Sequence, residues 1–299
     1  MEESKRITWN EIENKILKNQ SELLTKELLG NFPYENTGNE LRIPPWYNIF
    51  QLNNLIPLIA FFLVFRFISA KVKKHLWKDS VGFRQYRLQN LTVSLIHSII
   101  SGILAIHFAY FYTEAMFQQP MHWYQPWIKY GILFSMGYFF HDMRNTLQYK
   151  NEFSWFNIAL VLHHIGSIFA FVTAITSRKF VPFAYCALIM EANSIFLHGR
   201  TLMQLSNTST NYYTIYKFIQ IINVITFVGC RFGIQTWQMY WVFTHRFSMH
   251  PFFVAFGYCG CIIFFVINGF IFKKILIADF MPANYSRKNA AVYRDERKD

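Results

Sequence analysis

Several stretches of this chain are about 20 residues long and almost free of charged side chains. A helix needs about 20 apolar residues to cross a hydrocarbon core roughly 30 Å thick, and helices satisfy their own backbone polar groups inside lipid. We therefore predict an all-α, polytopic transmembrane helix bundle with about seven spans. Six spans are the alternative, because the third and fifth stretches are the shortest. The candidate spans are residues 52–70, 91–113, 127–143, 155–175, 180–197, 216–239 and 252–272.

Composition supports a membrane protein over a soluble one. The chain is 53% hydrophobic and 19% aromatic, with only 15% charged residues. Its net charge of +12 lies in short loops between the apolar stretches and in the C-terminal tail, which suits a membrane surface and argues against a nucleic-acid partner. The cysteines lie inside apolar stretches without a C-x-x-C motif, so we expect reduced packing residues. They are Cys186, Cys230, Cys259 and Cys261.

The chain divides into a polar start, a long apolar region and a basic end. Residues 1–50 include the sequence Thr-Trp-Asn-Glu at 8–11, which fits a capping box and predicts a short amphipathic helix. We expect 51–81 to hold the first span and a basic loop, 82–280 to form the main membrane domain, and 281–299 to be a basic tail.

The basic residues of the first two loops predict the orientation. The loop 114–126 contains no Lys or Arg, and short loops rich in these residues stay in the cytosol. With seven spans, the C-terminus then lies in the cytosol and the N-terminus outside. The loop 71–90 contains Lys71, Lys73, Lys74, Lys78, Arg84 and Arg87.

Polar residues recur at helical spacing inside the spans. In the second span they follow i, i+4, i+7 and i+11, and the third span repeats this pattern with His141 next to its last member. Burying such groups in lipid is costly, so each stripe should face the interior of the bundle. The two stripes are Asn90, Ser94, His97 and Ser101, and Gly131, Ser135, Tyr138 and Asp142.

The later spans add further polar groups. In the fourth span, Asn157, His164 and Ser167 share one face, whereas His163 lies about 100° around the helix, so the two histidines cannot point the same way. In the fifth span, Glu191 and His198 share a face. The sixth span leads through Gln220, Asn223 and Thr226 toward Arg231. The stripes together predict a polar-lined centre.

Two interpretations of these groups stay open. They could satisfy one another between helices, for example Asp142 with a histidine or Glu191 with Arg231. Alternatively, His163, His164, Asp142 and Glu191 could form a functional site, because four ionisable groups in the membrane exceed what packing requires.

The histidines do not match the boxes that bind two irons. Such boxes read H-x-x-x-H or H-x-x-H-H, but Leu160 stands three residues before His163 and Asn145 stands four after His141. A single metal ion on scattered histidines is the open alternative. We expect no metal and no other cofactor.

A set of motifs resembles the TLC-domain family, which includes the ceramide synthases and the translocon-associated membrane proteins. The resemblance covers about residues 82–280. The motifs are residues 90–98, Gly-Tyr-Phe-Phe-His-Asp at 137–142, the pair His163-His164, Glu-Ala-Asn-Ser-Ile-Phe-Leu at 191–197, and residues 200–206.

Within that family the chain resembles most the branch associated with membrane fluidity, whose members limit the incorporation of polyunsaturated acyl chains into phospholipids. The resemblance implies a multi-pass protein that handles phospholipids or acyl lipids, with the plasma membrane favoured and the endoplasmic reticulum as the alternative. The resemblance does not indicate whether the protein forms oligomers. Candidate lipid-binding residues are His97, His141, Asn157, Asn193, His198 and Arg231.

The sequence departs from the ceramide synthases in one motif. Their span after the histidine pair carries a His-Asp pair and a further aspartate, whereas here Glu191 is the one carboxylate and no histidine precedes His198. This difference favours a regulator without demonstrated catalysis. The alternative is an acyl-CoA-dependent acyltransferase, in which His163 or His164 acts as base or acyl acceptor and Glu191 or Asp142 orients it.

Overall fold

The computed structural model describes residues 45–148 and 155–281, with the side chains of 155–157 and 159 excepted. The amphipathic helix expected within residues 1–44 and the C-terminal tail lie outside the described residues. Within them the chain is helical and contains no strand. The main elements are α2 (Leu52–Lys71), α3 (Gly82–Phe111), α5 (Lys129–Gln148), α6 (Trp155–Ser177), α7 (Val181–Leu188), α8 (Met190–Leu205), α10 (Tyr213–Thr226), α11 (Ile234–Thr244) and α12 (Pro251–Phe280).

Short helices join or extend these elements. Two of them are π-helical: η2 (Val72–Leu76) continues α2, and η4 (Phe227–Gly233) joins α10 to α11 into one continuous rod. The remaining pieces are η1 (Trp46–Phe50), α4 (Thr113–Phe117), α9 (Thr208–Asn211) and η5 (Arg246–Ser248).

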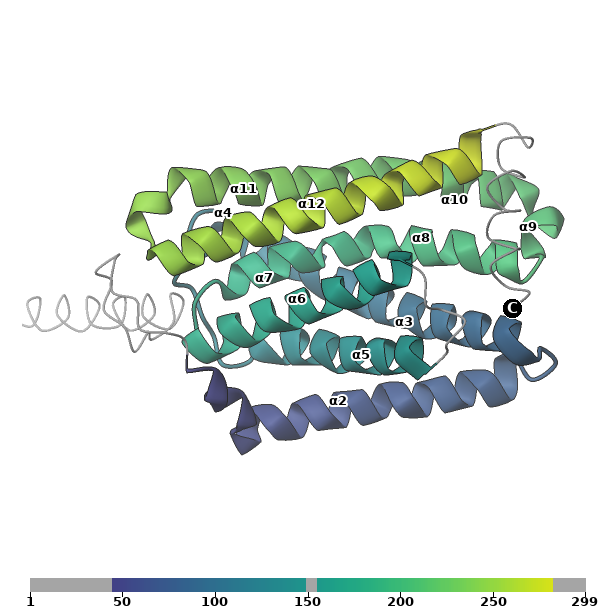
Figure 1. Ribbon diagram of the computed structural model, residues 1–299, viewed down its shortest axis with the longest axis horizontal. Helices are drawn as coiled ribbons and strands as arrows, with labels where there is room; N and C mark the ends of the chain where they lie inside the picture. The colour runs from purple at the N-terminus through teal and green to yellow at the C-terminus, as the bar shows by residue number, and fades with distance from the viewer. Residues whose placement is uncertain (1–44, 149–154, 282–299) are drawn as a thin grey trace, which may run out of the picture.

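The long helices run side by side along the length of the molecule (Figure 1). α2 lies along α5 at one side, and α11 lies along α12 at the other. Between them, α3 packs along α8, and α6 contacts both α5 and α12. Each long segment reverses the direction of the one before it, so the described chain forms an antiparallel bundle.

Among the residues that the structure describes, six helical segments are long and apolar enough to cross a membrane. The third expected span, α5, is not among them, although it is 20 residues long. However, α3 ends at one end of the bundle and α6 begins near the other, so α5 must traverse the bundle between them (Figure 1). Its lower hydropathy comes mostly from polar side chains that face inward, which an average over the helix cannot distinguish from exposed ones.

Two glycines permit close helix contacts. A Cβ atom on Gly137 of α5 would lie 2.8 Å from Cβ of Phe61 and 2.9 Å from the backbone nitrogen of Phe62 in α2. On Gly102 of α3 it would lie 3.2 Å from the backbone of Ala192 in α8. Small residues at helix crossings bring backbones together in membrane bundles. The second contact places the polar stripe of α3 directly against Glu191.

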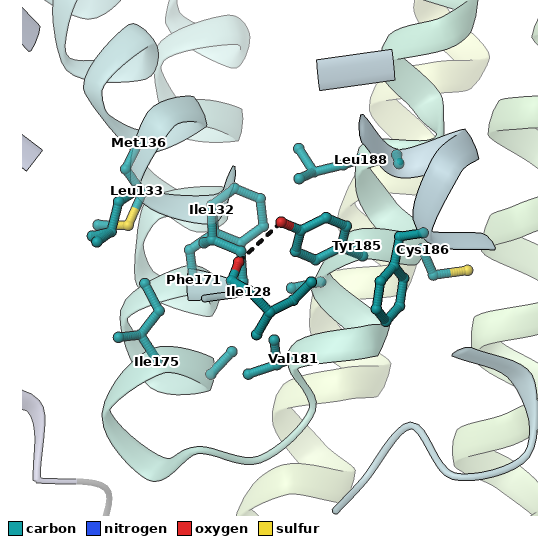
Figure 2. Packing of buried hydrophobic residues seen from close by; sticks show 14 of the residues in the cluster. Ile128, Ile132, Leu133, Met136, Phe171, Ile175, Val181, Tyr185, Cys186 and Leu188 are labelled. Carbon is teal, nitrogen blue, oxygen red and sulfur yellow. Dashed lines mark hydrogen bonds between the residues drawn. The ribbon is translucent and has the colours of Figure 1, made fainter. Parts of the chain in front are cut away.

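The apolar part of the interior gathers where α5, α6 and α7 meet near their ends. In Figure 2, Ile132 lies toward Phe171 and Tyr185, whereas Leu133 points the other way, beside Met136. The Tyr185 hydroxyl donates a 2.9 Å hydrogen bond to the backbone oxygen of Ile128, which satisfies a polar group that would otherwise be buried unpaired (Figure 2). Large apolar side chains also cover the outside of the bundle, as expected for a surface that meets lipid.

Candidate functional site

Asp142 of α5 lies buried among polar groups from two neighbouring helices. Asn90 of α3 donates a 2.7 Å hydrogen bond from Nδ2 to Asp142 Oδ1. On its other side, Oδ2 lies 3.6 Å from Nδ1 of His164 in α6. Asn90 begins the inward stripe of α3, and Asp142 ends the inward stripe of α5. The helical repeat therefore already predicted that both face the centre. Packing of α3, α5 and α6 then brings them together.

His141 precedes Asp142, is also buried, and is connected to it through the side chains of Asn145 and Asn90. Its Nε2 shares a 3.0 Å hydrogen bond with Nδ2 of Asn145, one turn later in α5. Asn145 in turn accepts a 3.1 Å hydrogen bond from Arg66 of α2. Asn145 Nδ2 also donates to Asn90 Oδ1 of α3 at 3.2 Å, so the contacts of His141 reach both α2 and the Asn90–Asp142 pair.

Glu191 of α8 contacts two side chains of α3. Ser98 donates a 2.7 Å hydrogen bond to Glu191 Oε2, and His97 Nδ1 lies 3.7 Å from the same oxygen. The other ring nitrogen of His97, Nε2, shares a 2.9 Å hydrogen bond with Ser101 Oγ, which fixes the orientation of the imidazole. The Glu191 side chain keeps 18% of its surface exposed, while His97 is fully buried.

Tyr138 connects the two carboxylate environments. Its ring stacks on His97 with a centroid separation of 3.9 Å and lies 6.5 Å from the ring of His164. Its hydroxyl donates to Ser94 at 2.8 Å. We define the histidine–carboxylate group as His97, Tyr138, Asp142, His164 and Glu191.

The histidine pair diverges as the helical repeat predicts. His164 stacks on Phe139 of α5 at 4.8 Å, while His163 packs against Phe264 of α12 at 4.7 Å. The two rings lie 5.8 Å apart. The prediction that the two histidines point different ways is confirmed.

Four of these imidazoles each leave a buried nitrogen without a hydrogen-bond partner among the described residues. Such an atom is uncommon, because a buried polar group left unpaired costs about 1 to 3 kcal/mol. At 3.6 and 3.7 Å, the carboxylates are close to two of these nitrogens but too far for good hydrogen bonds. The atoms are Nδ1 of His97, His141, His163 and His164.

A second polar group surrounds Arg231. Its guanidinium donates at 2.7 Å to Asn193 Oδ1, at 2.8 Å to Ser194 Oγ, both in α8, and at 2.9 Å to Asn268 Oδ1 in α12. Asn193 also donates to Asn223 of α10 at 3.1 Å. The π-helical segment η4 carries Arg231, and such segments often occur at functional positions. We define the Arg231 group as Asn193, Ser194, Asn223, Arg231 and Asn268.

The structure places some of the expected site residues in these two groups, whereas His141, His163 and His198 belong to neither. It brings Asp142 to a histidine, as one interpretation expected, but Glu191 hydrogen-bonds to Ser98 and approaches His97 in place of the expected pair with Arg231. Asn193 belongs to the Arg231 group. The side chain of Asn157 lies outside the described residues.

Two polar residues of α12 with partners inside the bundle were not predicted. Arg200 of α8 pairs with Asp279 near the end of α12, and its Nε donates to Asp279 Oδ2 at 2.6 Å. Asn268 is an isolated amide in the apolar sequence of α12. A search for single polar residues in otherwise apolar spans would have found both Asp279 and Asn268, because each needs a partner inside a bundle.

Within the described parts of the chain, no group of three or more His, Cys, Asp or Glu side chains is arranged to hold a metal ion. The polar atoms of the histidine–carboxylate group instead suit proton exchange or hydrogen bonding to a polar ligand.

Comparison with known proteins decides the family. The sequence profile of the TLC domain matches residues 87–277, which is most of the chain and includes both polar groups. The chain belongs to the TLC-domain family. The match begins within α3 and ends within α12.

The alignments with curated relatives cover most of this chain and most of each relative. TLC domain-containing protein 2 of Danio rerio is 26% identical over 204 residues, or 68% of this chain and 80% of the relative. TLC domain-containing protein 1 of Gallus gallus is 27% identical over 71% of this chain and 80% of its own. TLC domain-containing protein 2 of Homo sapiens is 26% identical, with 75% and 83% covered. The chain is therefore a multi-pass membrane protein of the TLC-domain type.

Proposed function

We propose that this protein regulates the composition and fluidity of a membrane by limiting the incorporation of polyunsaturated acyl chains into phospholipids. The observation that carries the proposal is the histidine–carboxylate group, in which buried imidazole nitrogens without partners among the described residues lie beside two carboxylates inside an apolar bundle. The similarity to TLC domain-containing proteins 1 and 2, and the resemblance to the branch associated with membrane fluidity, support it.

The location of this group favours a lipid ligand. A soluble metabolite would have to leave water to reach it, whereas a phospholipid or acyl lipid already shares the bilayer with the bundle. The partly exposed Glu191 and the unpartnered Nδ1 of His163 offer an acceptor and a titratable nitrogen to the polar part of such a lipid. We therefore assign phospholipids or acyl lipids as partners, with no cofactor.

An acyltransferase is the second candidate. The 3.6 Å separation between His164 Nδ1 and Asp142 Oδ2 favours it, because a carboxylate at this position could orient an imidazole that acts as base or acyl acceptor for acyl-CoA. Against it stands the motif at Glu191, which lacks the His-Asp pair of the ceramide synthases and is already hydrogen-bonded to Ser98.

Lipid analysis of cells that lack the protein separates the two functions. Cis double bonds disorder acyl packing, so loss of a protein that limits polyunsaturated chains should fluidise the membrane. We expect more polyunsaturated phosphatidylethanolamine and phosphatidylcholine, better tolerance of added saturated fatty acid, and an unchanged ceramide profile. A fall in one class of ceramide with unchanged phospholipid unsaturation would refute the regulatory function and support the acyltransferase.

The purified protein provides a second test. Mass spectrometry of the lipids that remain bound should detect a phospholipid or acyl lipid that is depleted in a Glu191→Gln variant. Incubation with acyl-CoA and a sphingoid base should yield no product. Product formation that His164→Ala abolishes would instead assign catalysis to the histidine pair.

We further propose the plasma membrane as the location, with the endoplasmic reticulum as the alternative, and a cytosolic C-terminus. Seven passes and the basic loop after α2 support this orientation. A tag after Asp299 should be accessible only in permeabilised cells, and a tag before Met1 without permeabilisation. Access to both tags from the same side would contradict the seven-pass arrangement.

A further inference from the structure

The segment after α2 concentrates exposed positive charge at one end of the bundle. Residues 71–78, which we call the basic turn, contain four lysines and one histidine, all exposed and without an acidic residue between them. Arg84 is exposed nearby on α3, and Asp79 is the one acidic residue in the stretch from 71 to 87. The basic residues of the turn are Lys71, Lys73, Lys74, His75 and Lys78.

Hydrogen bonds hold this turn against α3. The indole nitrogen of Trp77 donates to Thr92 Oγ1 at 3.0 Å, and Gln85 Nε2 donates to the backbone oxygen of Trp77 at 2.8 Å. Just before the turn, Gln89 donates to Ser69 Oγ at 2.6 Å. The lysines are therefore presented from an anchored backbone, which reduces the entropy lost when they bind a ligand.

Apolar side chains lie between the lysines and point to a lipid ligand over a soluble one. Leu76 is 56% exposed within the turn, and Phe67 is 63% exposed one turn before Lys71, whose ammonium lies 5.3 Å from the Phe67 ring centroid. A nucleic-acid backbone or a small soluble anion would leave these apolar surfaces in water. A lipid offers acyl chains to Leu76 and Phe67 and phosphate to the lysines.

We propose that the basic turn is a binding surface for anionic phospholipids, which it retains in preference to zwitterionic ones of the same leaflet. Each lysine near an anionic surface adds attraction, which falls off within a Debye length and therefore weakens as added salt shortens that length. This function is separate from that of the histidine–carboxylate group and does not depend on it. Lipid binding by the basic turn also differs from the role of basic loops in membrane insertion, because it continues after the protein has been inserted.

The test uses the full chain, purified in detergent and mixed with equal amounts of phosphatidylserine and phosphatidylcholine that carry identical acyl chains. Native mass spectrometry then counts the lipids that stay bound. The wild type should retain phosphatidylserine over phosphatidylcholine by about fivefold or more. The combined variant Lys73→Gln, Lys74→Gln, Lys78→Gln should bind both lipids equally, because these exposed side chains supply the attraction.

A matched variant removes three positive charges elsewhere: Lys217→Gln, Arg246→Gln, Lys273→Gln. It should keep the preference, which separates a defined surface from net charge. Raising the salt to about 0.5 M should weaken the preference in the wild type. Three outcomes would each overturn the proposal. The wild type could retain the two lipids equally, the triple variant of the basic turn could keep the preference for phosphatidylserine, or the matched variant could lose it to the same extent. Displacement of the bound lipid by inorganic phosphate, at an ionic strength at which chloride leaves the lipid bound, would show an ordinary anion site and also overturn the proposal.

Discussion

The histidine–carboxylate group and the Arg231 group are both buried and polar, but they use their hydrogen-bonding atoms differently. Arg231 donates to three neutral oxygens at 2.7 to 2.9 Å. By contrast, Nδ1 of His97 and of His164 each lie 3.6 Å or more from a carboxylate and have no hydrogen-bond partner among the described residues. The Arg231 group has short, directed hydrogen bonds, whereas the histidine–carboxylate group contains imidazole nitrogens without a hydrogen-bond partner among the described residues.

This difference suggests different roles. Short hydrogen bonds from one guanidinium to α8 and α12 join helices that are far apart in sequence, as polar residues do when they stabilise membrane bundles. Unpartnered nitrogens beside carboxylates cost stability and persist where a ligand or a proton uses them. We therefore expect substitutions in the Arg231 group to reduce folding and substitutions in the histidine–carboxylate group to reduce function.

The largest effect on stability should come from Arg231→Met. This change leaves Asn193, Ser194 and Asn268 without their donor and should cost about 2 to 3 kcal/mol. Thermal unfolding of the purified protein and its abundance in cells measure the loss. Arg144→Met is the control, because Arg144 is exposed and contacts Gln148 on its own helix. Equal stability of the two variants would show that Arg231 is not a structural centre.

Gly102→Val should have the next largest effect, about 1 to 2 kcal/mol. The added Cβ would meet the backbone of Ala192 at 3.2 Å and push α3 away from α8, which separates His97 from Glu191. Lipid composition in cells that carry the variant should resemble that of cells without the protein. Gly260→Val in α12 provides the control, since no atom lies within 4 Å of its Cβ position. A fully active Gly102→Val variant would mean that the α3–α8 spacing does not matter.

Glu191→Gln should change stability by less than about 1 kcal/mol and abolish activity. The amide keeps the shape and can accept the hydrogen bond from Ser98, but it removes the negative charge beside His97. Glu191→Leu should also lower abundance, because Ser98 loses its acceptor. Protein level by immunoblot and phospholipid unsaturation by mass spectrometry, measured together, distinguish the two. Normal lipid composition with the Gln variant would remove Glu191 from the site.

His163→Gln should have the smallest effect on stability, within about 0.5 kcal/mol, because its half-buried ring has an unpartnered Nδ1. If the nitrogen serves a ligand or a proton, the variant loses activity at normal abundance. His107→Gln makes the same chemical change at an exposed position of α3 and should keep activity. Loss of abundance with retained activity per molecule would instead assign His163 to packing against Phe264.

The sequence alone determined the helices and their inward faces. A span must be about 20 apolar residues long, and a repeat of 3.6 residues fixes which side chains share a face. Ser94, His97 and Ser101 are buried together for this reason, and His163 diverges from His164 for the same reason. Hydropathy alone does not identify α5 as a span, because an average over the helix cannot record that most of its polar side chains face inward.

Only the tertiary structure decided which stripe meets which. Helical periodicity is a property of one helix, whereas a partner depends on how two helices are spaced and rotated relative to each other. The close approach of α3 and α8 at Gly102 and Ala192 brings Glu191 to Ser98 and His97. Arg231, the partner that charge alone suggested, instead binds Asn193, Ser194 and Asn268. The energy of a buried contact depends on distances of a few ångströms, and these are set by packing between helices far apart in the chain.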